Sequence, residues 1–218
     1  MEITFIGHAC FRIKGKDTTV VVDPYQPDKL GYKLPKLTAD IVLVSHHHDD
    51  HNYAEGVKDY KLFVDTAGEF EMNNTFIYGI QTFHDDKKGE LRGKNTIYQI
   101  DIDGFSLLHL GDLGHELSED TLERISDIHV LMIPVGGIYT INSATASKVI
   151  SSIEPAIVIP MHYQTDDLTG LSEKLDPLSK FLEEMGEENG VRKEEILKLS
   201  AMTNIPEETE IVVLKPAH

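Results

Sequence analysis

The sequence predicts a layered α/β fold, and three observations support this prediction. The first half of the chain holds short apolar runs rich in β-branched residues, which Gly and Pro separate. The second half adds amphipathic segments of helical period. Between those segments lie two continuous apolar runs, His129–Ile133 and Ala156–Ile159, which are typical of strands covered on both faces. Periodicity therefore predicts layers of strands with helices outside them, without fixing the topology.

Strands dominate the elements expected in the first half. A further pair, Thr96–Ile102 and Phe105–Leu110, is joined by Asp103-Gly104, a dipeptide that favours a tight hairpin turn. The expected strands that come before this hairpin are Glu2–Ile6, Cys10–Ile13, Thr18–Val22, Ile41–Val44, Leu62–Val64 and Thr75–Ile80.

Three helices are expected in the second half. Ser118 stands before a run with acidic residues in its first turn, which is typical of a capped helix N-terminus. The segment Asn142–Ile153 follows the same logic and ends before Pro155. Helical spacing of apolar residues predicts the third helix over Leu171–Met185.

Length and composition indicate one globular domain. With 218 residues, of which 40% are hydrophobic and 26% charged, the chain can bury a full core, so we expect a single domain over residues 1–218. No apolar run approaches the roughly 20 residues that cross a bilayer. The N-terminal segment lacks the pattern of a signal peptide, and Cys10, the single cysteine, allows no intramolecular disulfide. We therefore expect a cytoplasmic protein.

The charge balance limits the kinds of partner that the protein is expected to bind. The net charge is −17, from 37 acidic and 20 basic residues. Such a field repels nucleic acid and anionic membranes, because binding phosphate needs clustered Lys and Arg. It does not exclude a small anionic substrate, since bound cations can dominate a local pocket. We expect a small-molecule substrate, and the sequence leaves a homo-oligomer open.

A histidine cluster is the most informative segment. An apolar strand runs directly into a polar loop with the pattern His46-x-His48-x-Asp50-His51. Chance would produce this pattern about 0.002 times in a chain of this composition. Imidazole and carboxylate are the ligands that zinc and similar ions prefer. In extended backbone, residues two apart point the same way, so His46 and His48 can converge on one ion and the Asp50-His51 pair can serve a second.

Three distant residues are candidates for the remaining ligands. His84, Asp112 and His162 each follow an apolar strand, at the point where a sheet edge meets a loop. Taken singly, a histidine after a strand is more often an ordinary hydrogen-bonded residue than a ligand. The prediction therefore depends on the three meeting at the histidine cluster.

With these residues the chain resembles the metallo-β-lactamase superfamily. Within it, the chain is most similar to the short "Zn-dependent hydrolase of the β-lactamase fold" branch related to ascorbate-6-phosphate lactonases. The resemblance covers nearly the whole chain. Its motifs are Ile6-Gly-His8-Ala-Cys-Phe-Arg-Ile, Val21-Val-Asp23-Pro, His46–His51, Phe83-His84-Asp, Gly93-Lys-Asn95-Thr, His109-Leu-Gly-Asp112-Leu-Gly-His115, Ile133-Pro-Val-Gly136-Gly137-Ile-Tyr139-Thr140 and Ile159-Pro-Met-His162-Tyr163.

The resemblance implies an αβ/βα four-layer sandwich with two metal ions at one edge. It also implies that Asp23 is the buried aspartate that braces the histidine loop. The implied metal ligands form two groups and one bridge: His46, His48 and His84 for the first ion, Asp50, His51 and His162 for the second, and Asp112 between them. The ligand types favour zinc but also accept manganese, iron and nickel.

Such a centre would support hydrolysis by a hydroxide that the two ions hold. Asp50 is our candidate for orienting this nucleophile and passing a proton to the leaving group, with a purely ligating role as the equal alternative. His8, His115, Tyr139 and Thr140 are expected near the metal edge as candidate substrate contacts, and the two histidines are equally suited to bracing ligands.

The leading functional hypothesis is cleavage of a small ester, lactone or phosphoester. A nuclease or phosphodiesterase is the first alternative, but the basic residues are scattered rather than gathered in a track. Diiron redox chemistry is the second, although such relatives carry glutamate where this chain has His48. A metal-binding scaffold without catalysis is the third.

Overall fold

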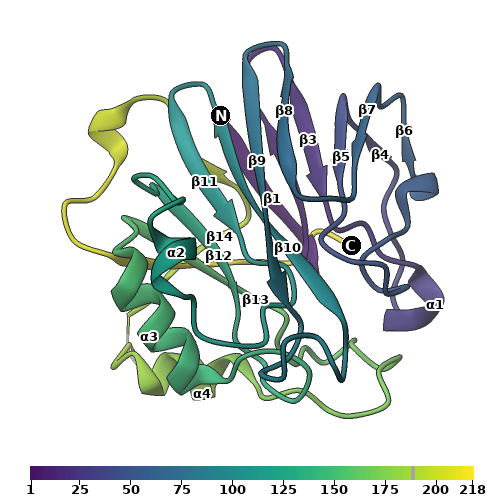
Figure 1. Cartoon of the computed structure of the whole chain (residues 1–218), viewed down its shortest axis with the longest axis vertical. Helices are drawn as coiled ribbons and strands as arrows, with labels where there is room; N and C mark the ends of the chain where they lie inside the picture. The colour runs from purple at the N-terminus through teal and green to yellow at the C-terminus, as the bar shows by residue number, and fades with distance from the viewer. Residues whose placement is uncertain (188–189) are drawn as a thin grey trace.

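The computed structural model, which describes residues 1–187 and 190–218, is built on two sheets packed face to face (Figure 1). The first sheet has six strands, of which β1, β2 and β3 are antiparallel neighbours, whereas β5 and β7 continue parallel to β3. In spatial order its strands are β15 (Leu197–Lys198), β1 (Glu2–Gly7), β2 (Cys10–Lys14), β3 (Thr19–Val22), β5 (Ile41–Leu43) and β7 (Leu62–Val64).

The second sheet has eight strands. Its half from β14 to β11 is parallel, and the half from β11 to β8 is antiparallel. In spatial order the strands are β14 (Arg192–Glu194), β16 (Glu210–Leu214), β13 (Ile157–Met161), β12 (Val130–Pro134), β11 (Phe105–His109), β10 (Lys94–Ile102), β9 (Thr75–Phe83) and β8 (Gly68–Met72).

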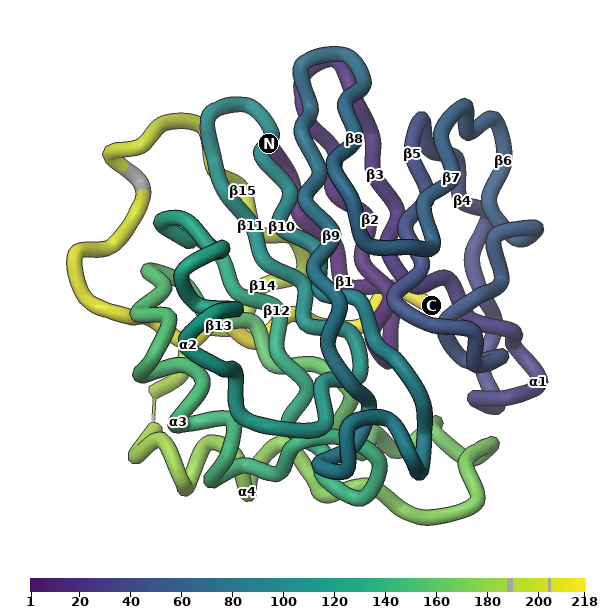
Figure 2. Tube along the Cα trace, viewed as in Figure 1, coloured from purple at the N-terminus to yellow at the C-terminus, as the bar shows by residue number. Residues whose placement is uncertain are grey.

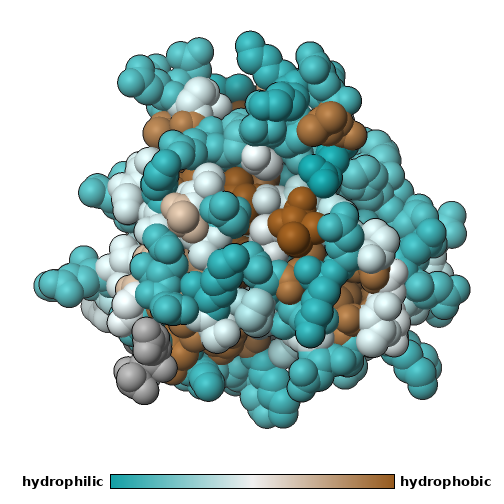
Figure 3. Space-filling model, turned by 90° about the horizontal axis from the view of Figure 1, so that it is seen from below, coloured by the Kyte–Doolittle hydropathy of each residue, from teal (hydrophilic) through white to brown (hydrophobic). Residues whose placement is uncertain are grey.

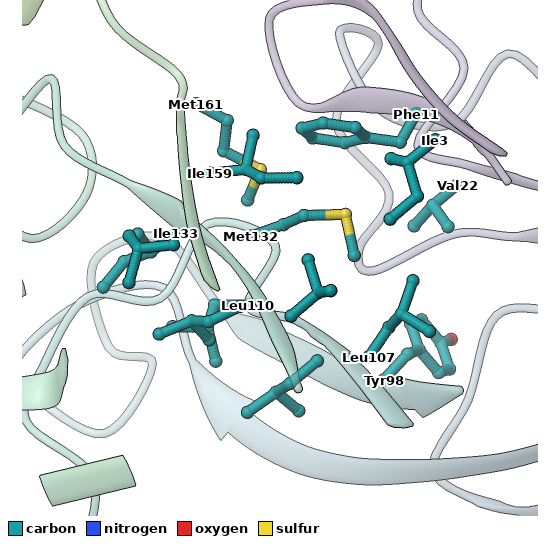
Figure 4. Close-up of a cluster of buried hydrophobic side chains, with 14 of the residues drawn as sticks. Ile3, Phe11, Val22, Tyr98, Leu107, Leu110, Met132, Ile133, Ile159 and Met161 are labelled. Carbon is teal, nitrogen blue, oxygen red and sulfur yellow. The ribbon is translucent and has the colours of Figure 1, made fainter. Parts of the chain in front are cut away.

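The main core lies between the two sheets. Strand residues alternate faces, so each sheet turns one row of apolar side chains inward. In Figure 4, Ile3, Phe11 and Val22 of the first sheet lie opposite Leu107 and Met132 of the second. These residues are fully buried, and burying side chains of this size contributes about 1.5–3 kcal/mol each.

The outer layers differ in thickness. Helices α2 (Glu119–Leu122), α3 (Ser143–Ile153) and α4 (Leu178–Glu184) cover the eight-stranded sheet (Figure 1). The six-stranded sheet is covered by a thinner layer with its own apolar cluster, which includes Tyr25, Leu30 and Val42. That layer consists of α1 (Pro27–Leu30), the 3₁₀ turn η1 (Ala54–Gly56) and the two-stranded sheet of β4 (Leu37–Thr38) and β6 (Val57–Lys58). The predicted α/β sandwich is therefore confirmed.

The helix caps follow the sequence. The Ser118 side chain accepts from the Thr121 backbone N–H, and the Asn142 side chain accepts from the Thr145 N–H. The helix that ends before Pro155 is therefore confirmed. None of the described residues forms a helix long and apolar enough to cross a membrane.

The helix predicted over Leu171–Met185 is wrong in its first half. Residues 171–177 form a loop, and α4 begins only after Pro177. Proline disfavours helical backbone at the residue before it, here Asp176. The apolar period misled because Leu175 packs in the outer cluster over the six-stranded sheet, whereas Phe181 belongs to the main core.

The C-terminal part holds strands that the sequence pattern did not predict. β16 joins β13 in parallel, and β15 pairs with β1. A further 3₁₀ turn, η2 (Met202–Asn204), lies between them. The acidic stretch Glu207-Glu-Thr-Glu210 leads directly into β16, which begins at Glu210.

Strand direction brings distant residues to one edge. β1, β3 and β5 run in one direction in the first sheet, and β9, β11, β12 and β13 share a direction in the second. Their carboxyl ends meet at the lower edge in Figure 1. Figure 2 shows the segment after β13, in green, running along this edge towards α1. The residues that directly follow these strands form the candidate site.

Candidate metal centre

The histidine loop follows β5 and is held by one buried carboxylate. Asp23, at the end of β3, accepts from the Ser45 N–H at 2.7 Å and from the Ser45 hydroxyl at 2.6 Å. Its Oδ2 also lies 3.0 Å from Nδ1 of His51. The Ser45 Oγ lies 2.9 Å from Nδ1 of His46. The predicted bracing role of Asp23 is confirmed, and both imidazoles direct Nε2 away from the brace.

The three distant candidates meet the histidine cluster at Asp112. His84 Nε2 lies 3.1 Å from Asp112 Oδ2, and His162 Nε2 lies 3.3 Å from the same oxygen. His51 Nε2 lies 3.2 Å from the other oxygen, Oδ1. His46 Nε2 is 3.9 Å from Oδ2. Four imidazoles thus surround the carboxylate of Asp112.

The side chains that could hold a metal ion form three overlapping groups, of which one is His46, His51 and Asp112. His46, His48 and His84 bring ligand atoms within 4.8 Å of one another, and so do His8, Asp50, His51 and His162. The rings of His46 and His48 are 4.6 Å apart, as the spacing of two residues predicted. The structure therefore brings all seven predicted ligands together.

Among the described residues, several buried polar atoms in this cluster make no hydrogen bond. They include His46 Nε2, as well as His51 Nε2 and Asp112 Oδ1, which lie 3.2 Å apart as an ion pair; all three residues are at most 5% exposed. A buried polar atom without a partner costs about 1–3 kcal/mol. Lone pairs of imidazole and carboxylate directed at one another are the donor set of a divalent cation. The residues therefore fit a metal centre.

The electrostatics agree with that fit. Burial would raise the pKa of Asp112, but the charges of His162 and His51 outweigh burial and hold it well below the usual range. Burial would lower the pKa of His51, yet Asp112 and Asp50 raise it well above the ordinary value. The two carboxylates thus favour positive charge between them. For His46, burial and the charge of His51 lower the pKa, so its ring is neutral and ready to ligate.

A cavity of about 380 Å³ opens directly onto this cluster. Its inner wall is formed by metal-site residues, among them Asp50 and Asp112. The rest of its wall comes from other segments: Lys29, Asp49, Arg92, Tyr139, Gly170, Leu171 and Ser172. The volume is that of a small-molecule pocket.

Two contacts organise the outer wall. Lys29 Nζ lies 2.8 Å from Asp49 Oδ2, so the histidine loop also contributes to the rim. The Tyr139 hydroxyl lies 2.8 Å from Ser172 Oγ and accepts from the Glu173 N–H at 3.0 Å. His47, in the same loop, is exposed and lies beside Asp65.

Of the predicted substrate contacts, Tyr139 lines the cavity and three others do not. His8 is buried, with Nε2 3.2 Å from Asp50 Oδ2, so it braces Asp50. His115 uses Nε2 to accept from the Phe83 N–H. Thr140 donates its hydroxyl to a neighbouring backbone carbonyl. His8, His115 and Thr140 are thus not among the residues that line this cavity, and their roles as substrate contacts stay predictions.

Two close approaches lock the strand ends together. A Cβ on Gly136 would lie 2.1 Å from the carbonyl oxygen of His162, so the glycine allows the backbone of His162 to approach closely. A Cβ on Gly114 would lie 2.2 Å from the Asp85 backbone nitrogen. His162 itself has φ 52°, a left-handed conformation that costs energy for a residue other than glycine.

Sequence reasoning did not single out the basic residues of the wall. Lys29 and Arg92 are isolated residues of a short helix and a loop, and nothing in their local pattern distinguishes them. Two further histidines have structural contacts: His129 Nδ1 accepts from the Ser106 N–H, and His218 stacks on Tyr32.

The α/β sandwich and the cluster of histidines and aspartates at one sheet edge can be compared with those of known protein families. A family model described as "Beta-lactamase superfamily domain" matches residues 2–162, and the chain belongs to this superfamily. A curated relative, a UPF0173 metal-dependent hydrolase of Thermoplasma acidophilum, is 29% identical over 77% of this chain and 85% of its own length. The chain is thus placed among the metal-dependent hydrolases of this fold.

Solved structures support the same placement. A candidate Zn-dependent hydrolase of the metallo-β-lactamase superfamily from Thermotoga maritima has a TM-score of 0.79 and 34% identity, covering 98% of this chain and 97% of that one. CmlA, a diiron β-hydroxylase from Streptomyces venezuelae, has a TM-score of 0.63 at 16% identity, over 80% of this chain and 47% of its own. The second likeness shows the fold alone.

Proposed function

We propose that this protein hydrolyses a small-molecule ester, lactone or phosphoester with the help of two divalent ions. The main observation in support is the buried cluster in which four imidazoles surround Asp112. Several polar atoms of the described residues in this cluster make no hydrogen bond. When bound, two such ions lower the pKa of a water molecule and stabilise negative charge on the attacked group. The proposed ligand groups are His46, His48 and His84, then Asp50, His51 and His162, with Asp112 shared.

The side chains around this centre would act on the substrate in distinct ways. Asp50 is half-buried, lines the cavity and is held at Oδ2 by His8. From this position Oδ2 can orient a water molecule, take up a proton from that water and pass the proton to the leaving group. Tyr139, fixed by Ser172, offers a hydroxyl on the opposite wall for orienting the substrate.

The shape and charge of the cavity support a small substrate over a polymer. A volume of about 380 Å³ suits a molecule of modest size. The basic residues of its lining are only Lys29 and Arg92, which do not form the track that a nucleic acid backbone requires.

A metal and substrate panel tests the proposal. Protein loaded separately with zinc, manganese, iron or nickel is assayed for bound metal by elemental analysis and then given lactones, carboxylic esters and phosphodiesters. We expect nearly two ions per chain and hydrolysis in at least one substrate group, abolished by a chelator. Asp112→Asn serves as the inactive reference. Substoichiometric metal, or hydrolysis that the chelator and this variant leave unchanged, would contradict the proposal.

A further inference from the structure

Arg92 stands on the cavity wall without an acidic partner. It lines both the cavity and an adjoining hollow of about 510 Å³ that reaches His46 and Lys94. Within residues 1–187 and 190–218, its side-chain contacts are a backbone carbonyl and an aromatic ring, and it forms no ion pair. Of the two Lys and Arg residues described on the cavity wall, Lys29 is paired with Asp49, whereas Arg92 has no carboxylate partner.

Three contacts hold Arg92 in place and leave its charge available. Its backbone N–H donates to Asp85 Oδ2 at 2.7 Å. Its Nη2 donates to the carbonyl oxygen of Ile138 at 3.3 Å, and the guanidinium carbon lies 5.5 Å from the centre of the Tyr139 ring. These side-chain partners are neutral, so they orient the guanidinium without neutralising it.

The loop that carries Arg92 is organised by one buried carboxylate. Asp85 follows the proposed ligand His84 and is 4% exposed. Its oxygens accept four backbone N–H groups at 2.7–3.0 Å, those of Lys87, Gly89, Leu91 and Arg92. The loop is therefore fixed before any ligand arrives, which lowers the entropic cost of binding.

The partner loop is also held in an unusual conformation. Ile138 has φ 59°, which is rare and costly for a β-branched residue. Its side chain is 45% exposed, and that of Leu91 is 68% exposed. Figure 3 views the molecule from below, towards the lower edge of Figure 1; on this face hydrophobic residues form small groups on a largely hydrophilic surface. The strained turn presents a carbonyl to Arg92 and an apolar side chain to solvent.

We propose that Arg92 is the specificity-determining residue of the cavity and that the substrate carries an oxyanion, a carboxylate or a phosphate, apart from the bond that is cleaved. A guanidinium presents paired N–H donors that match the two oxygens of such a group. Lys29 is less suited to this role because Asp49 already pairs with it at 2.8 Å. This inference rests on the proposed function.

Matched esters test the inference in the metal-loaded protein. The substrates are 4-nitrophenyl hydrogen glutarate, which ends in a carboxylate, and 4-nitrophenyl pentanoate, a neutral ester of similar length. Arg92→Met should lower kcat/KM for the glutarate ester about 10- to 100-fold, mainly through KM, and change the pentanoate value less than about twofold. Arg92→Lys should fall between. Arg124→Met, an exposed arginine outside the cavity lining, is the matched control.

A binding measurement keeps the inference separate from the hydrolase proposal. Glutarate, inorganic phosphate and neutral glutaramide are titrated calorimetrically into wild type, Arg92→Met and Arg124→Met, each with verified metal content. We expect at least one anion to bind wild type about tenfold more tightly than Arg92→Met, and the preferred anion identifies the source of the oxyanion. Equal anion affinities in the two variants would overturn the inference, even if both esters are hydrolysed. Loss confined to Arg92→Met would support it, even if neither ester reacts.

Discussion

The inner and outer walls of the cavity are built in opposite ways. The inner wall consists of imidazoles and carboxylates that follow strands; His84, Asp112 and His162 are buried, whereas Asp50 is half-buried and His48 is exposed. The outer wall consists of half-exposed or exposed side chains from loops and the short helix α1, which contact one another. Rigid strands can hold several atoms within a few tenths of an ångström, as a metal requires, whereas loops tolerate variation. The difference suggests that the inner wall determines the chemistry and the outer wall the substrate.

The largest effect is expected for Asp112→Asn on the inner wall. The amide cannot offer two charged oxygens to the four surrounding imidazoles, so metal binding and catalysis should both fail. We expect hydrolysis to fall about 1000-fold or more, with bound metal reduced in elemental analysis. Circular dichroism should show an intact fold. A variant that keeps both metal and activity would contradict the proposal that the inner wall determines the chemistry.

Asp23→Asn tests the support behind the inner wall. Asp23 accepts from Ser45 and His51, and the amide would lose the charge-assisted part of these bonds. We expect metal affinity to fall about 10- to 100-fold, measured by competition with a chromogenic chelator. At saturating metal, KM should stay close to wild type. A change in KM alone would contradict a role in bracing.

Asp85→Asn tests the loop of the outer wall. We expect KM for an anionic ester to rise about three- to tenfold with kcat little changed, because the amide offers one acceptor oxygen in place of two. Metal content should match wild type. A fall in metal content instead would assign Asp85 to the support of His84.

The same carboxylate predicts a pH dependence of stability. Burial would raise the pKa of Asp85, but the backbone N–H groups of Arg92, Gly89, Lys87 and Leu91 outweigh burial and lower it to about 2. Because the folded pKa is lower than the unfolded value of about 3.9, this stabilisation is complete above roughly pH 4 and is lost as the pH falls towards 2. The difference in unfolding free energy between wild type and Asp85→Asn should therefore shrink between pH 4 and pH 3 in urea titrations. A constant difference would contradict the assigned cause.

The smallest effect is expected for Tyr139→Phe. The change removes a hydroxyl that contacts Ser172 and the Glu173 N–H at the exposed rim. Such a bond contributes about 0.5–1.5 kcal/mol, so we expect a two- to tenfold rise in KM with metal content unchanged. Steady-state kinetics on the preferred ester measure it. A large loss of kcat would instead place the hydroxyl at the reacting atoms.

The sequence alone predicted the residues of the inner wall because these residues follow a local sequence pattern. Each proposed ligand is a His or Asp at or just after the end of an apolar strand, and parallel strands bring their carboxyl ends to one edge. The resemblance to a known superfamily also pointed to Asp23, whose contacts with Ser45 and His51 the structure shows. The capped helices followed from local chemistry in the same way.

Only the tertiary structure decided the outer wall. Arg92 becomes distinctive because Asp85, Ile138 and Tyr139 surround it, and those contacts join separate loops that no local pattern connects. The loop before Pro177 depended likewise on which of two apolar clusters received Leu175. Local sequence determines strand ends because backbone hydrogen bonding and side-chain alternation are local. Contacts between loops depend on where the packed layers place them, which becomes fixed only when the whole chain has folded.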